Sequence, residues 1–176
     1  MCNKPELPFD LRMFEREAKV RGLYLTVSCD FERVLSDIAA KCAIEENSQP
    51  LRDGFRIKLP FEMGAKLDKC IEILKAYNEG YYNQYKEQFD VIKELSIYRT
   101  MLAHGFSHYD EAKQDDTTLY FTWIEVIDDE NGKKLRRLRR DTITFQPFVL
   151  RMLHYKEHIL TLVDLVLKLR EERGNE

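Results

Sequence analysis

Residues 94–108 contain the two side chains best suited to acid–base and phosphate chemistry. Arg99 and His104 are separated by four residues, and Gly105 follows the histidine directly. An arginine can clamp a phosphate, and a histidine can transfer a proton near neutral pH. The same residues also fit an ordinary helix end, because a histidine in the last turn and a glycine after it commonly close helices. Two interpretations therefore stay open, a candidate site and a helix terminus.

Helix geometry limits how these two side chains can cooperate. Five positions turn about 500° on an ideal helix, so Arg99 and His104 point about 140° apart. Thr100 and Ser96 share a face with His104, because they precede it by whole multiples of four residues. Burying this polar ridge without partners would be costly, so we expect it at the surface, in a cleft or at a dimer interface. Arg99 and His104 could therefore contact the same phosphate only if His104 turns at the helix end or if a second copy of the helix faces the first.

A second candidate is the run Lys133–Arg140, in which six of eight residues are basic. Such a run can bind a nucleic-acid backbone through salt-dependent phosphate contacts. The opposing interpretation is stronger, because residues 110–130 hold eight acidic residues that would neutralise the run across a hairpin. Basic residues also protect exposed strand edges from aggregation. The candidate substrate-binding residues are Ser96, His108, Lys133, Lys134, Arg136 and Arg137.

A third pattern, His154 to His158, matches the H-x-x-E-H motif of inverted zinc peptidases. That motif needs a further ligand well downstream, and the chain after His158 reads as the same helix. The favoured interpretation places both histidines on a polar helix face, and an intermediate one has them line the same cleft as Arg99. We therefore expect neither a metal nor another cofactor.

Apolar periodicity predicts four helices, and a cluster of β-branched and aromatic residues predicts two strands. A two-stranded hairpin is marginal alone, so it must pack on the helices. The predicted fold is all-α, an antiparallel four-helix bundle with a β-hairpin inserted between the third and fourth helices. We expect one domain over residues 1–176, with the insertion at about 118–145. The predicted helices are 9–44, 61–78, 84–104 and 148–172, the strands are 118–127 and 133–145, the loops are 45–60 and 110–117, and the arm is 1–8. We also expect a bend or an end of the second helix at 79–82 and a turn between the strands at 128–132.

Composition restricts the class of protein further. The net charge is −3, so nucleic-acid binding would need a local basic patch. The four cysteines form no C-x-x-C pair, which favours reduced thiols, mostly in the core, in a cytoplasmic protein. No basic region followed by an apolar run stands at the N-terminus, and no apolar stretch approaches the roughly 20 residues of a membrane span. We expect no signal peptide and no membrane contact.

The run from Met63 to Phe106 resembles the HEPN family (higher eukaryotes and prokaryotes nucleotide-binding). The family signature is an arginine, four to six residues, and a histidine at the end of a bundle helix, which Arg99 and His104 fit. The order of four helices is also similar. The resemblance implies a metal-independent endoribonuclease that acts as a homodimer, in a toxin–antitoxin or phage-defence setting with an antitoxin as partner.

The same resemblance implies roles for three residues. His104 would act as general acid or base, Arg99 would stabilise charge on the phosphate, and Thr100 would assist them. Nucleases of the family usually carry Asn, Asp or His directly after the arginine, where this chain has Thr100. The alternative is a non-catalytic, dimeric HEPN-like module that binds a nucleotide or a protein partner.

Overall fold

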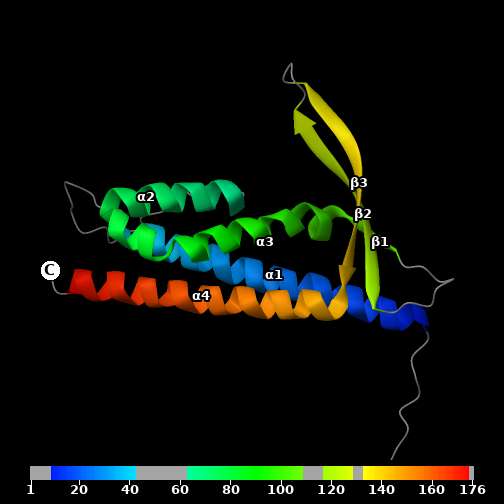
Figure 1. Cartoon of the computed structure of the whole chain (residues 1–176), viewed down its shortest axis with the longest axis horizontal. Helices are drawn as coiled ribbons and strands as arrows, with labels where there is room; N and C mark the ends of the chain where they lie inside the picture. The colour runs from blue at the N-terminus through cyan, green and yellow to red at the C-terminus, as the bar shows by residue number, and fades with distance from the viewer. Residues whose placement is uncertain (1–8, 43–62, 109–116, 129–132, 175–176) are drawn as a thin grey trace, which may run out of the picture. The chain divides into compact units, whose positions relative to one another are not determined.

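The computed structural model describes residues 9–42, 63–108, 117–128 and 133–174. These residues form four helices and three strands, and helix dominates (Figure 1). The predicted arm at 1–8 and the predicted loop at 45–60 lie outside the described residues, as do most of the predicted loop at 110–117 and of the predicted turn at 128–132. In chain order the elements are α1 (Phe9–Cys42), α2 (Met63–Gln84), α3 (Lys86–His104), β1 (Phe106–His108), β2 (Thr118–Asp128), β3 (Lys134–Thr144) and α4 (Phe145–Gly174).

The helices follow the predicted pattern, with one informative difference in α2. The sequence predicted the helix to about Asn78 with a bend or an end at residues 79–82, and α2 bends at Asn78 and continues to Gln84. Asn78 has an extended backbone (φ −159°, ψ 104°), and its side-chain oxygen accepts hydrogen bonds from the N–H groups of Gly80 (2.9 Å) and Tyr81 (3.3 Å). An asparagine that accepts bonds from the next turn is an N-cap, so the chain restarts the helix after the break.

The sheet contains one more strand than the sequence predicted. The hairpin of β2 and β3 is antiparallel, from Thr118 opposite Thr144 to Asp128 opposite Lys134. The additional strand, β1, pairs with β2 on its other edge, so the order is β1-β2-β3. β1 is only three residues long, which is too short to show a period-two pattern in the sequence.

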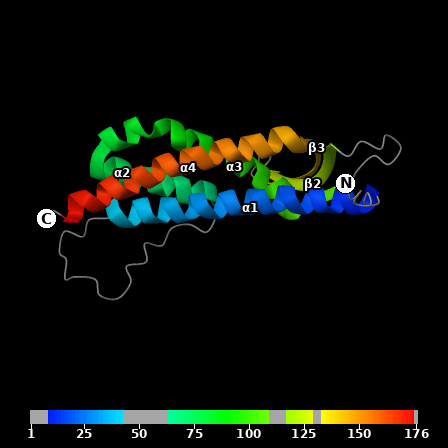
Figure 2. The same cartoon turned by 90° about the horizontal axis from the view of Figure 1, so that it is seen from below.

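The chain divides into two compact units. The sheet unit comprises Met1–Leu25 and Ile97–Leu153, and the helical unit comprises Thr26–Ser96 and His154–Glu176. In the sheet unit, the hairpin base lies beside the N-terminal part of α1 and the start of α4 (Figure 2). Buried side chains of this unit come from two alternate positions of β2, from one position of β3 and from the helices; they include Met13, Val20, Leu102, Leu119, Phe121, Ile143, Phe148 and Met152.

In the helical unit, buried apolar side chains recur every three or four residues along each helix, as the predicted stripes require. They include Phe31, Leu35, Ile38, Leu67, Leu74, Phe89, Ile92, Leu162 and Leu165. An ion pair of 2.8 Å joins Lys66 to Glu32 at the surface of this unit. The antiparallel bundle arrangement itself stays a prediction.

The described cysteines are free thiols, as predicted, and two of the three are buried. Burial raises the pKa of the Cys70 thiol to about 12, so this side chain is an inert core residue at neutral pH. Cys29 is exposed. Within the described ranges, no helix combines the length and the apolar character that a membrane crossing requires.

Candidate functional site at the end of α3

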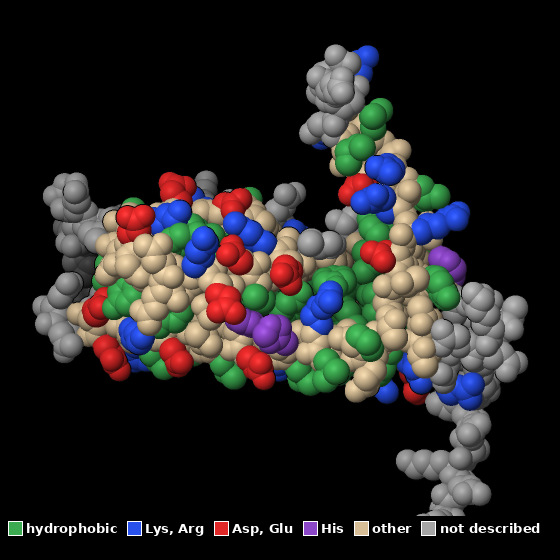
Figure 3. Space-filling view, viewed as in Figure 1, with side chains coloured by type: hydrophobic (Ala, Val, Ile, Leu, Met, Phe, Trp, Pro, Cys, Tyr) green, Lys and Arg blue, Asp and Glu red, His purple; other side chains and the backbone are tan. Residues whose placement is uncertain are grey.

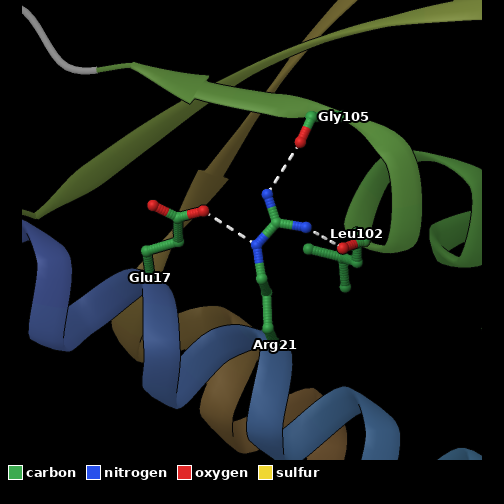
Figure 4. A network of polar contacts seen from close by, with 4 residues as sticks. All are labelled: Glu17, Arg21, Leu102 and Gly105. Carbon is green, nitrogen blue, oxygen red and sulfur yellow. Dashed lines mark hydrogen bonds and ion pairs between the residues drawn. The ribbon is translucent and has the colours of Figure 1, made fainter.

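Arg21 of α1 binds the C-terminal end of α3 (Figure 4). Its Nη1 donates a hydrogen bond to the carbonyl of Leu102, and its Nη2 donates to the carbonyl of Gly105 at 2.7 Å. Its Nε lies 2.8 Å from a carboxylate oxygen of Glu17, one turn earlier on α1. The guanidinium carbon also lies 5.4 Å from the ring centroid of Phe121. One side chain thus joins α1, α3 and the sheet.

This arrangement explains how α3 stops. The last carbonyls of a helix have no partner within the helix, and Arg21 supplies donors at this end. The Gly105 N–H closes the final turn on the Met101 carbonyl at 2.8 Å. A Cβ at Gly105 would lie 2.3 Å from the Met101 oxygen, so no residue other than glycine fits here without a shift. The helix-stop role predicted for Gly105 therefore comes from close approach.

Arg99 and His104 lie near this end of α3, both in the sheet unit. Arg99 is half-buried and His104 is exposed. Within the described part of the chain, neither side chain forms a hydrogen bond or an ion pair. Arg21 binds the Leu102 carbonyl in the last turn of α3 and the Gly105 carbonyl just beyond it, and no described contact ties the His104 side chain to the helix end. The exposed His104 is accessible to a ligand, and the half-buried Arg99 is accessible in part.

The predicted polar ridge of Ser96, Thr100 and His104 is described only in part. The side chain of Thr100 lies outside the described residues. Ser96 belongs to the helical unit, where its hydroxyl donates to the carbonyl of Lys93 at 2.7 Å and borders a pocket with Met63. The ridge as a continuous surface stays a prediction.

His108 lies in β1 and stacks on Tyr120 of β2. The two ring centroids are 5.7 Å apart, and the ring planes differ by 28°. Both rings border a pocket of about 310 Å³, which is also lined by Phe121, Arg140, Asp141 and Thr142. The Asp141 carboxylate accepts a hydrogen bond from the Thr142 N–H at 2.7 Å. The pocket thus combines two stacked rings with an exposed guanidinium.

The basic run occupies β3 and is divided between the two faces of the hairpin. Lys133 lies just before the strand, and Lys134 is opposite Asp128. Arg136 is opposite Val126, and Arg137 is opposite Glu125. Because side chains alternate along a strand, Lys134, Arg136 and Arg140 share one face, and Arg137 and Arg139 share the other.

Charge neutralisation across the strands, which the sequence predicted, occurs on one face of the hairpin. The Arg139 Nε lies 3.1 Å from a carboxylate oxygen of Glu125. In the described residues, Lys134, Arg136 and Arg140 have no such partner. Arg137, on the same face as Arg139, also has no ion pair in the described residues. Among the residues of the run that belong to β3, neutralisation within the described part of the chain is therefore confined to Arg139.

The two histidines of the H-x-x-E-H pattern contact each other in the helical unit. Their Nε2 atoms are 3.1 Å apart, and a carboxylate oxygen of Glu157 lies 3.6 Å from Nδ1 of His154. His154 is exposed, as predicted, but the predicted polar-face position is wrong for His158, which is buried. Among the described residues, no group of three or more His, Cys, Asp or Glu side chains could hold a metal ion.

Sequence reasoning missed Arg21, Phe106 and Tyr120. Arg21 is 81 residues from Leu102 in the chain, and no local pattern marks such a contact. Phe106 and His108 alternate around Ser107, but three residues are too few to indicate a strand.

No family model, curated protein or solved structure matches this chain. The HEPN resemblance accordingly stays a prediction.

Proposed function

We propose that the chain is a HEPN-like, metal-independent endoribonuclease that acts as a homodimer, with Arg99 and His104 at a cleft between the two copies. One observation carries this proposal. His104 is exposed and without a partner in the described residues, at a helix end where Arg21 binds the carbonyls of Leu102 and Gly105. An exposed histidine without a described partner, five positions from an arginine that also has none, has the chemistry needed for phosphodiester cleavage.

The reaction is an internal transesterification. A general base removes the proton of the ribose 2′-hydroxyl, and the resulting oxygen attacks the adjacent phosphorus. The bond from phosphorus to the 5′-oxygen breaks, a general acid protonates that oxygen, and a 2′,3′-cyclic phosphate remains. His104 is the proton-transfer group, and Arg99 stabilises the charge on the phosphoryl oxygens.

A homodimer solves the geometric problem of the motif. Arg99 and His104 point about 140° apart on one ideal helix, so a single copy of α3 cannot direct both side chains at one phosphate. In the dimer, the second copy of α3 brings its own arginine or histidine to that phosphate. Two copies of His104 also provide one base and one acid for the two proton transfers. In this proposal the four helices form an antiparallel bundle, Thr100 orients the phosphate, and the protein acts in the cytoplasm as a toxin or defence factor with an antitoxin partner.

The test is cleavage of several single-stranded RNAs by the purified protein in EDTA. His104→Ala and Arg99→Ala should each reduce the rate by about 100-fold or more, which is the usual size of a general acid–base contribution. Matched controls are His154→Ala and Arg33→Ala, which remove an exposed histidine and an exposed arginine of the helical unit. Both controls should cleave like the wild type.

Two results would contradict the proposal. Equal cleavage by the His104→Ala and His154→Ala proteins would mean that the activity does not come from this site. A monomeric mass of 21.0 kDa by light scattering at micromolar concentration would contradict the shared cleft. If no RNA is cleaved, the non-catalytic binding module becomes the better account.

A further inference from the structure

The strand register creates an exposed face of the three-stranded sheet that no described element covers. We call it the open face. At the base of the hairpin its members alternate with the buried residues Leu119, Phe121 and Ile143, which point to the opposite face, whereas between Lys134 and Thr142 the side chains of β3 are exposed on both faces. By register, the positions on the open face are Phe106 and His108 of β1, Thr118, Tyr120, Thr122, Ile124, Val126 and Asp128 of β2, and Lys134, Arg136, Leu138, Arg140, Thr142 and Thr144 of β3.

The open face is unusually apolar for a surface. The side chain of Phe106 is 82% exposed, and those of Ile124 and Leu138 are 57% and 59% exposed. Phe106 and Arg140 lie on the two outer strands, each opposite Thr122 of β2, so an exposed ring and an exposed guanidinium stand at the same level of the sheet. Figure 3 shows hydrophobic, basic and acidic side chains together along the hairpin. Contiguous exposed apolar groups of this kind mark a binding surface.

The charge of the open face indicates what kind of molecule binds there. Lys134, Arg136 and Arg140 have no ionic partner in the described residues, whereas Glu125 and Arg139 pair on the opposite face. A second copy of the open face would place arginines against arginines, which is unfavourable. An anionic occupant with flat apolar groups fits better.

We propose that the open face binds a single-stranded segment of RNA. Bases stack on Phe106 and on the His108–Tyr120 pair, where the pocket of about 310 Å³ lies, and phosphates contact Arg136 and Arg140. Stacking rings combined with basic side chains are the usual means of holding unpaired nucleic acid. The choice of RNA rests on the proposed function, and the surface is separate from the catalytic pair Arg99 and His104.

The test is fluorescence anisotropy of a labelled, mixed-sequence, single-stranded RNA, with His104→Ala as the background so that the probe stays intact. Phe106→Ala should weaken binding by about 5- to 150-fold, the range measured for loss of one stacked base. Phe14→Ala removes another exposed ring of the sheet unit and should leave the affinity unchanged. Arg140→Ala should weaken binding, and the neighbouring substitution Arg139→Ala, on the opposite face, should not.

Salt dependence gives an independent readout. The two phosphate contacts, from Arg136 and Arg140, predict a slope of about −1.4 for log affinity against log salt, because single strands give roughly −0.7 per phosphate contact. Affinity should then fall about 7-fold between roughly 50 mM and 200 mM salt. Arg140→Ala should reduce the slope by about 0.7, whereas Phe106→Ala should leave it unchanged.

Several outcomes would overturn the inference. It fails if Phe106→Ala and Phe14→Ala bind alike, or if Arg139→Ala and Arg140→Ala weaken binding equally. It also fails if the protein binds poly-glutamate and not RNA, which would point to an acidic protein partner. If the wild type cleaves RNA but these variants bind normally, the inference fails and the proposed function stands. If binding depends on the open face but the wild type cleaves no RNA, the inference stands and the proposed function fails.

Discussion

Arg21→Ala should loosen the junction between α3 and the sheet and destabilise the protein. The substitution removes the donors to the carbonyls of Leu102 and Gly105, the ion pair with Glu17 and the contact with the ring of Phe121. The terminal turn of α3, which carries His104, would then depend on water for these hydrogen bonds.

The expected size follows from these contacts. An i, i+4 ion pair contributes about 0.3–0.5 kcal/mol, and a cation–π contact at a partly exposed site about 0.5–1 kcal/mol. Hydrogen bonds to a charged donor are worth about 1.5–3 kcal/mol each, but the Arg21 side chain is 26% exposed, so water recovers part of that value. We expect a loss of about 3 kcal/mol in the free energy of unfolding. For a chain of this size that lowers Tm by roughly 6–12 °C.

Urea denaturation measures this loss as a lower midpoint with an unchanged m-value. Glu17→Gln is the matched control, because it removes only the ion pair and should cost about 0.5 kcal/mol or less. Arg21→Lys should be intermediate, since a lysine cannot bind both carbonyls and the carboxylate at once. If Arg21→Ala loses no more stability than Glu17→Gln, the assigned role of Arg21 is wrong.

Two further predictions concern Gly105 and Tyr81. Gly105→Ala should lower the free energy of unfolding, measured by urea denaturation, by more than about 1 kcal/mol, because the new Cβ would strike the Met101 oxygen. The control Gly22→Ala, on an open helix surface, should raise it by about 0.5–1 kcal/mol. Equal effects of the two substitutions would contradict the close approach at Gly105. The hydrogen bond to Glu172 raises the pKa of Tyr81 from 10.0 to about 12. Its stabilising effect should therefore be complete below pH 10 and be lost as pH rises to about 12. The urea midpoint of the Tyr81→Phe protein should therefore fall less between pH 10 and pH 12 than that of the wild type. An equal fall in both proteins would refute the role of the Tyr81 hydrogen bond.

Much of the fold could be predicted from local patterns. Stripes such as Phe31, Leu35 and Ile38 repeat over enough turns to be unambiguous, and they are buried as expected. The β2–β3 hairpin followed from β-branched and aromatic residues in Thr118–Asp128. α2 continues beyond Asn78 because this residue caps a new helical segment. In a sequence, a single capping asparagine looks the same as an asparagine in an ordinary loop.

The candidate site depended on contacts that no local pattern encodes. Arg99 and His104 could be identified from the sequence. The hydrogen bonds from Arg21 to the carbonyls of Leu102 and Gly105 at the same helix end could not. It could identify a basic run, but not that β1 would add Phe106 and His108 beside it. Both the Arg21 contacts and the pairing of β1 with β2 were missed, because they join residues that are distant in the chain.

The most direct test of the central claim is the chemistry of the RNA ends produced in EDTA. The proposed use of His104 and Arg99 predicts 2′,3′-cyclic phosphate and 5′-hydroxyl ends, formed by the wild type and absent with His104→Ala of normal stability. Ends that carry a 5′-phosphate, or the same cyclic ends at the same rate from the His104→Ala protein, would contradict it.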